Sequence, residues 1–543
     1  MAFLRIGNSL IICSLTIAAV VASTTDAVPQ ESQDEAALSV AMFVDAALEE
    51  DCFGNYNITS RSCTGTDGYA FSTLKKGAGA LGVISSRLLV REGVYRESVA
   101  VNANGTAVRR LYLTNFPGEE PIIDGEYQRE NCVVLGSTKS PHGGHYVTIE
   151  GLTCRNITSI TGSSGGILVV GTMFAEIRKN HIYNTGPLST KVPSPGIRVI
   201  SPGQYTLVEY NHVHHIGGGI GTRYTDGDYP GAPSFPTIRG NYVHHIQMEC
   251  ENEPGCTGAS CCDQQNYAAG IVFSSQTMHG LAEHNVVHHT MDIGIGTYET
   301  GGNIVRYNVA YLTDIPKSGG GNGAGIKIFP SSGPYVLGPD YVHHNISFFN
   351  RFRGVEFSTA NVFGILAYHN LIYRTFTIGV SGTVNGTHFM NSASFANTFQ
   401  DIKGYSAPNS LVYSNYLSPE HLESHFPHLG LLNINLNPSA IWPEQGCVPI
   451  ATDIDGDCTP NILEPLNFGS CDQGVQCLMD AEEAVGFARQ RMSVVFTPSA
   501  DSSLPNSGSD LSKVLPPGLQ KYVDFLGNSI SRPKPDRGAT ERP

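Results

Sequence analysis

A two-part repeat constrains the fold of this chain more than any other feature of its sequence. A Gly-Ile or Gly-Val step opens a short apolar stretch, and an asparagine opens a later one. The first part occurs as GGILVV, PGIRVI, GGIGTR, AGIVFS, IGIGTY, AGIKIF, RGVEFS and IGVSGT. The second part carries Asn156, Asn180, Asn211, Asn241, Asn285, Asn308, Asn345 and Asn370. The Ile or Val precedes the next such asparagine by 13 to 15 residues in five of seven units. Short strands and turns at a near-constant period indicate a stacked solenoid.

The repeat resembles the right-handed parallel β-helix of the pectin-lyase-like superfamily. The stretches RLLVREGVYRESVAV and RRLYLTNFPGEEPIIDG resemble its opening coils, and YVDFLGNSISRPKPDRGATE resembles its closing segment. The resemblance implies an all-β solenoid over residues 65–420. It leaves the chemistry open, because this fold carries lyases, hydrolases, esterases, epimerases and adhesins.

The two ends of the chain differ in composition from the repeat. Arg5 followed by an apolar run from Leu10 to Ala22 predicts a signal peptide over 1–22 and a secreted, extracellular protein. An amphipathic pattern over 34–50 predicts a helix that caps the solenoid, or else a removed pro-segment. Residues 421–543 form a Cys-rich C-terminal segment with a closing tail.

Composition restricts the partners. Twelve cysteines remain after Cys13 leaves with the signal, and an even number in a secreted chain predicts disulfides. They cluster at 52/63, 250–262 and 447–477, so we expect them to staple insertions and ends. The formal net charge of −15 argues against nucleic acid. No later segment is apolar enough to span a membrane, and we expect a monomer.

Val-His-His recurs at 213–215, 243–245, 287–289 and 342–344. The third residue after the repeat asparagine is His214, His244 or His288, and other coils have a Tyr or Phe there. The position therefore selects flat rings, which favours stacking between coils over a metal site. His343 and His344 precede their asparagine and belong to another register. Of the sequons Asn57, Asn104, Asn156, Asn345 and Asn385, those at Asn156 and Asn345 should be buried in the asparagine column and unglycosylated.

Chemistry on a β-helix must use outward side chains. Side chains alternate between the two faces of a strand. If the Ile of each Gly-Ile strand points inward, the residues one and three positions after it point outward. Neighbouring coils then gather Arg223, Tyr298, Lys327, Phe329 and Glu356 on one face, with Arg198 further along the same column. Asp292 and Glu299, before and after the strand of Tyr298, are the nearby carboxylates. Flat rings suit sugar faces, and the cations suit a uronate carboxylate. This set predicts a groove for an extracellular polysaccharide.

The favoured reaction is β-elimination on a uronic-acid polysaccharide, which needs a base and a cation for the enolate-like intermediate. The stretch GNGAGIKIF resembles the lysine-bearing strand of calcium-dependent pectate lyases, and this resemblance implies that Lys327 is the base. Crowding by arginines would lower the pKa of Lys327. The catalytic set is then Lys327, Arg223, Tyr298 and Glu356, and the substrate-binding set is Arg198, Phe329, Asp292 and Glu299. Lys327 and Glu356 can instead form a structural cross-strand ion pair.

Three other functions stay open. A glycoside hydrolase needs two carboxylates, which Glu356 with Asp292, Glu299 or Asp314 can supply, and Asp226 and Asp228 are further candidates. The others are a uronate epimerase and a non-catalytic carbohydrate-binding or cell-wall protein. Only Asp292, Glu299 and Asp314 stand where the pectate lyases carry a calcium-binding aspartate cluster.

The stretch DIDGDCTPNILE has the oxygen spacing of a calcium loop. It is similar to the loops of dockerins and thrombospondin-type repeats, although Cys458 replaces the usual glycine. The predicted calcium ligands are Asp453, Asp455, Asp457, Thr459, Asn461 and Glu464.

Overall fold

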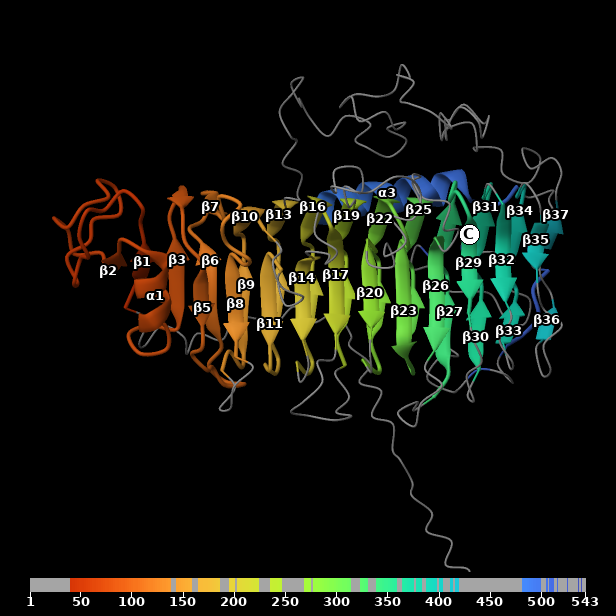
Figure 1. Cartoon of the computed structure of the whole chain (residues 1–543), viewed down its shortest axis with the longest axis horizontal. Helices are drawn as coiled ribbons and strands as arrows, with labels where there is room; N and C mark the ends of the chain where they lie inside the picture. Colours follow the sequence, from red (N-terminus) through yellow and green to blue (C-terminus); the bar gives the residue numbers. More distant parts are fainter. Residues whose placement is uncertain are drawn as a thin grey trace, which may run out of the picture.

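The chain forms a right-handed parallel β-helix, as the repeat predicts (Figure 1). The structure, a computed structural model, describes residues 40–137, 143–158, 165–185, 195–200, 203–223, 235–246, 268–274, 277–313, 323–330, 338–358, 364–375, 377–382, 387–397, 400–403, 411–413, 416–418, 481–499 and eleven later positions between 504 and 539. Its coils stack along one long axis, and every pairing between named strands is parallel.

Each coil passes through three sheets in turn. The first sheet has fourteen strands in the described residues. Its members are β1 Met42–Val44, β2 Tyr69–Phe71, β3 Arg87–Val90, β6 Leu111–Asn115, β9 Val147–Glu150, β12 Glu176–Arg178, β15 Leu207–Glu209, β18 Thr237–Arg239, β21 Leu281–Glu283, β24 Ile304–Arg306, β27 Asp340–His343, β30 Ile365–Tyr368, β33 Thr387–Met390 and β36 Leu411–Tyr413.

From β3 onward, each first-sheet strand is followed by a strand of the second sheet. Its described members are β4 Gly93–Tyr95, β7 Pro121–Asp124, β10 Thr153–Ile157, β13 His181–Thr185, β16 His212–Ile216, β19 Tyr242–Ile246, β22 Val286–Thr290, β25 Val309–Thr313, β28 Ile346–Phe348, β31 Leu371–Tyr373, β34 Ala393–Phe395 and β37 Tyr416–Ser418.

The third sheet contains the Gly-Ile and Gly-Val strands. Its described members are β5 Val99–Val101, β8 Val133–Gly136, β11 Ile167–Val170, β14 Pro195–Ile200, β17 Gly218–Arg223, β20 Ile271–Ser274, β23 Ile295–Thr300, β26 Ala324–Pro330, β29 Arg353–Phe357, β32 Ile378–Gly382 and β35 Gln400–Lys403. The Ile and Val side chains of all three sheets fill one continuous core.

A ladder of buried asparagines joins the first sheet to the second. From Asn180 to Asn345, the backbone N–H and the Nδ2 of each asparagine donate to the Oδ1 of the next, at 2.9 to 3.2 Å. Each Nδ2 also donates to a first-sheet carbonyl at 2.8 to 3.1 Å. The residue before each of these asparagines has a left-handed φ, which makes the turn tight. The ladder therefore fixes the register of seven successive coils.

Asn156 does not belong to this ladder, so its predicted place in the column is wrong. Leu152 holds the column position, because β10 pairs Thr153 with His181 and the Leu152 N–H donates to Asn180 Oδ1 at 3.1 Å. Asn156 lies at the far end of β10, partly exposed, with φ of 54°. Of the other sequon asparagines, Asn345 is fully buried as expected, Asn104 is exposed and Asn57 is partly exposed; Asn385 lies outside the described residues.

The predicted ring stack exists on the outer face of the second sheet. Tyr183, His214, His244, His288, Tyr311 and Phe348 follow one another at centroid separations of 4.7 to 5.3 Å and interplanar angles of 1° to 22°. His344 lies in a different stack, against Tyr307 and His369, as its register predicts.

The predicted helix over 34–50 is wrong where the structure describes it. Residues Met42–Val44 form β1, which pairs with β2 and β3. Both faces of this strand are buried, since Met42 and Val44 enter the main core and Phe43 packs against Tyr56. Such an all-apolar strand lacks alternation, and this made the segment look helical. The helix at this end is α1, Leu74–Ala80, whose Gly77 packs closely on Val44 and Leu88.

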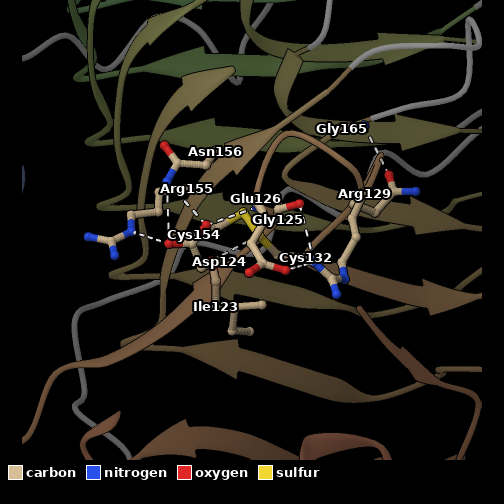
Figure 2. The surroundings of a disulfide bond; sticks show 11 residues. Ile123, Asp124, Gly125, Glu126, Arg129, Cys132, Cys154, Arg155, Asn156 and Gly165 are labelled. Atoms are coloured by element: carbon tan, nitrogen blue, oxygen red, sulfur yellow. Dashed lines mark hydrogen bonds and ion pairs between the residues drawn. A yellow bond between two sulfur atoms is a disulfide. The ribbon is translucent and has the colours of Figure 1, made fainter. Parts of the chain in front are cut away.

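Two disulfides lie in the described part of the chain. Cys52–Cys63 closes the N-terminal loop, as their proximity in sequence predicts. Cys132–Cys154 joins the approach to β8 with β10 inside the core. Figure 2 shows this bridge beside Asp124, which accepts hydrogen bonds from Arg155 at 2.8 Å and Asn156 at 3.1 Å.

A C-terminal helix that the sequence analysis did not anticipate, α3 Ala481–Val495, covers part of the second sheet (Figure 1). Its Ala484, Ala488 and Met492 pack with Tyr311 and Phe348 in one apolar cluster. Within the described residues, no helix is long and apolar enough to cross a membrane.

Replacing Asn241 by Ala tests the ladder. The change removes the acceptor of the Asn211 N–H and Nδ2, and the donor to Val208 O. Unpaired buried polar groups should lower the free energy of unfolding by about 3 kcal/mol, measured by denaturant titration. The exposed Asn102→Ala variant should change it by less than about 0.5 kcal/mol. Equal effects of the two substitutions would contradict the role of the ladder.

Candidate active site

The predicted register of the third sheet is confirmed by the strand pairing. Ile295 pairs with Ile326, and Ile326 with Val355, so the position after each of them forms one outward column. That column runs Leu168, Arg198, Gly221, Val272, Gly296, Lys327, Glu356, Ser381 and Lys403. Lys327 and Glu356 are therefore neighbours across one coil spacing.

An ion-pair cluster forms at this point of the column. Lys327 Nζ lies 3.5 Å from Glu356 Oε2, and Arg353 Nη1 lies 2.5 Å from Glu356 Oε1. The Ser358 hydroxyl donates to Glu356 Oε1 at 2.6 Å. Glu356 Oε2 accepts no hydrogen bond from the described residues. One carboxylate oxygen is thus held firmly, while the other has an ammonium group nearby and can still accept a hydrogen bond.

Asp292 belongs to the same electrostatic centre. It directly precedes Ile293 at the entry to β23 and is 5% exposed. Burial raises the pKa of Asp292 to about 7, the charge of Glu356 acts in the same direction, and Lys327 opposes it. The centre thus holds a carboxyl group that changes protonation near neutral pH beside a carboxylate paired with two cations.

Two aromatic rings flank this centre on the same face. Tyr298 on β23 stacks on Phe329 on β26, with centroids 4.8 Å apart and planes inclined by 16°. The Tyr298 residue is 45% exposed, which is unusual for a large ring. The pair therefore presents apolar surface beside Lys327.

The structure does not bring all predicted residues together. Arg198 on β14 and Arg223 on β17 lie four and three coils from β26, or about 19 and 14 Å at ~4.8 Å per coil. Arg198 is 8% exposed. Glu299 is exposed at the irregular end of β23, with φ of 53°. These positions leave Asp292, Tyr298, Lys327, Phe329 and Glu356 as the compact part of the prediction.

The arginine near Lys327 is not one of those expected from the sequence. Arg353, which the sequence analysis did not select, is the nearby arginine, and Glu356 pairs with both cations. Arg353 and Ser358 lie three residues before and two residues after Glu356. The sequence signal for both is their short distance from Glu356 along the chain, which lets their side chains reach its carboxylate.

Calcium in the groove is not supported by the described side chains. Groups of three close ligand side chains in the described residues consist of histidines alone. Asp292 is buried next to Lys327, and Glu299 stands apart at the strand end. Oxygen-rich calcium shells need several carboxylates or carbonyls together, so this pair does not fit. The predicted loop from Asp453 to Glu464 lies outside the described residues, as do Asp226, Asp228 and Asp314.

Comparisons with known proteins support the fold. A family model described as "Right handed beta helix region" matches residues 126–310. No curated protein matches the sequence.

Three solved structures illustrate the structural similarity. Pectate lyase Pel9A is 12% identical, with 93% of this chain and 98% of that chain covered and a TM-score of 0.45. XylC in complex with xylose is 12% identical, with 66% and 75% covered and a TM-score of 0.44. The GH136 lacto-N-biosidase from Eubacterium ramulus is 12% identical, with 70% and 67% covered and a TM-score of 0.42. At these identities the similarity concerns the fold alone.

The raised pKa of Asp292 predicts a pH-dependent stability. The carboxyl is protonated in both states below the unfolded value near 3.8, and between there and about 7 only the folded state keeps its proton. This group therefore lowers the free energy of unfolding as pH rises through that window. Asp292→Asn should gain about 3 kcal/mol relative to wild type between pH 4.5 and pH 8, measured by denaturant titration. A wild-type-to-variant difference that is the same at both pH values would contradict the buried, protonated Asp292.

Proposed function

We propose that this chain is a secreted polysaccharide-processing enzyme that cleaves a uronate-containing glycan by β-elimination. The observation that carries the proposal is the pairing of Lys327 with Glu356, neighbours in one outward column of the third sheet, with Arg353 bound to Glu356 and Asp292 within the same electrostatic centre. The disulfides Cys52–Cys63 and Cys132–Cys154 suit an extracellular location.

Local charge favours an anionic sugar. The formal charges of Lys327, Arg353 and Glu356 sum to +1 + 1 − 1 = +1, and the sum falls to 0 when Asp292 loses its proton to become a base. In either form Lys327 and Arg353 offer a uronate two cations, although the chain carries −15 overall. The stacked Tyr298 and Phe329 offer an apolar platform for the sugar ring beside it.

The four groups divide the chemical work. Elimination transfers the proton on the carbon alpha to the uronate carboxylate to a base. The bond between the β carbon and the glycosidic oxygen then breaks, a carbon–carbon double bond forms between the two carbons, and the leaving oxygen takes a proton from solvent to become a hydroxyl. In this proposal Lys327 and Arg353 stabilise the negative charge of the enolate-like intermediate. Asp292 is the base in this proposal. A carboxyl with a pKa of about 7 is partly deprotonated at neutral pH and still has enough proton affinity to remove a proton from the substrate. Lys327 thus has a cation's role here, because Glu356 pairs with it.

A glycoside hydrolase is the second candidate, and the contrast between the two carboxyl groups favours it. Glu356 is held by Arg353, Lys327 and Ser358, whereas burial keeps Asp292 protonated to about pH 7. Environments that separate two carboxyl groups in this way define a general acid and a base or nucleophile. Asp292 would then protonate the leaving oxygen.

Replacing Lys327 by Ala tests the site. Wild-type protein incubated with pectate, alginate and neutral glycans should release products with unsaturated-sugar absorbance. Loss of the cation should reduce the rate by about 100-fold or more. Lys403→Ala is the matched control, because Lys403 is an exposed lysine of the same column, two coils beyond Glu356, and its replacement should leave the rate unchanged. Full activity of Lys327→Ala would refute the site, and reducing ends without absorbance would refute elimination.

The pH dependence separates the two reactions. If Asp292 is the base, kcat/KM rises with pH through about 7; if it is the general acid, kcat/KM falls through the same value. Asp292→Asn should abolish that limb of the profile in either case. A limb near pH 7 that persists in the variant would show that another group is responsible.

A further inference from the structure

The outer face of the second sheet contains histidines that lie outside the ring stack of His214, His244 and His288. The first residue after the ladder asparagine is His181 in β13 and His212 in β16. Their rings lie beside the third-position stack rather than within it. His181 Nε2 is 2.7 Å from His214 Nε2, and His212 Nε2 is 2.8 Å from His244 Nε2.

The ring nitrogens link further along the strands. His214 Nδ1 lies 2.7 Å from His215 Nδ1, and His244 Nδ1 lies 2.6 Å from His245 Nδ1. Stacking alone requires ring faces, which Tyr and Phe supply equally in neighbouring coils. In the next coil the Tyr242 hydroxyl takes the first-position place and meets His288 Nε2 at 3.0 Å, so two ring nitrogens face each other only where both positions are histidine.

One group has a ring, His214, inclined to both of its neighbours, although His181 and His212 are stacked on each other at 18°. His181, His212 and His214 have ligand nitrogens within 4.8 Å of one another. The planes of His181 and His212 are inclined to that of His214 by 31° and 40°. Elsewhere the geometry is less suitable: His215 and His245 are parallel to within 1° at 4.8 Å, so their in-plane lone pairs point side by side.

The accessibility of the rings also suits a ligand set. His181 is partly exposed, whereas His212 and His214 are 5% and 3% exposed. His181 Nδ1 is buried without a hydrogen-bond partner among the described residues.

We propose that His181, His212 and His214 form a binding site for one divalent transition-metal ion of the zinc or copper class. Three imidazoles without a carboxylate favour these ions over calcium or magnesium. Metal–nitrogen bonds of about 2.0–2.1 Å require ligand nitrogens roughly 3.3 Å apart, so the 2.7 Å contact must widen by about 0.6 Å. His181 is the ring at the partly exposed edge and can make this movement. The site lies on a different sheet from Lys327 and is independent of the glycan reaction.

Cobalt and zinc titrations of the full chain, stripped with a chelator, test the site. Wild type should bind one ion through this cluster, with the visible absorption of tetrahedral cobalt. The His181 ring lies 4.6 Å from Tyr183 and 4.9 Å from His212, centroid to centroid. His181→Phe keeps a ring in this place but removes both ring nitrogens. It should lower the affinity at least about tenfold. His284→Phe is the control, because His284 stacks on Tyr307 outside the cluster, and its affinity should equal that of wild type.

Two results would overturn the proposal. One is an absence of cobalt or zinc binding by the wild-type chain, which would leave the cluster as a hydrogen-bonded row. The other is equal binding by His181→Phe and wild type, which would place the ion at other histidines. His181→Gln, compared with His181→Phe, separates loss of the ligand from loss of the ring, and circular dichroism verifies that both variants fold.

Discussion

The buried asparagine ladder is the interaction on which the rest of this structure depends. Each rung satisfies its side-chain oxygen and nitrogen with neighbours in the coil stack and with a first-sheet carbonyl. A turn that placed the asparagine one residue earlier would strand these groups in the core, at a cost of about 1–3 kcal/mol for each. The ladder therefore sets the start of every second-sheet strand from β13 to β31. The ladder asparagine fixes the positions of the residues that follow it. The third residue after it therefore stacks from coil to coil, and a histidine at the first position contacts that stack.

The same register extends to the third sheet. Inward Ile and Val side chains pair coil to coil, and this brings Lys327 beside Glu356 although 29 residues separate them in sequence. A groove built on such a scaffold has rigid spacing along its axis. Its chemistry then depends on a few outward residues and on how burial alters them. At Asp292 burial raises the pKa of the carboxyl.

Much of this could be predicted from the sequence, because a solenoid turns sequence offsets into spatial columns. The outward columns, the His214–His244–His288 stack and the separate register of His344 all follow from counting after Asn or Ile. Counting residues from the repeat asparagine or isoleucine gives the wrong assignment at the N-terminal end of the solenoid and at the start of the ladder. Phe43 is buried outside the coil, so β1 shows no alternation, and Leu152 replaces the asparagine at the start of the ladder.

The composition of the site was less accessible from the sequence. The prediction selected residues one and three positions after Ile, so it missed Arg353, which precedes Val355 and pairs with Glu356. It also grouped Arg198 and Arg223 with Lys327, although coil spacing separates them by three or four strands. Periodicity gives the face on which a residue lies, whereas proximity along the axis requires the number of coils between residues.

A crystal structure with a bound uronate oligosaccharide would show whether the third-sheet column binds the glycan. We expect a sugar carboxylate within hydrogen-bonding distance of Lys327 or Arg353, and a sugar ring against Tyr298 and Phe329. An oligosaccharide bound on another face of the β-helix, with the third-sheet column empty, would contradict it.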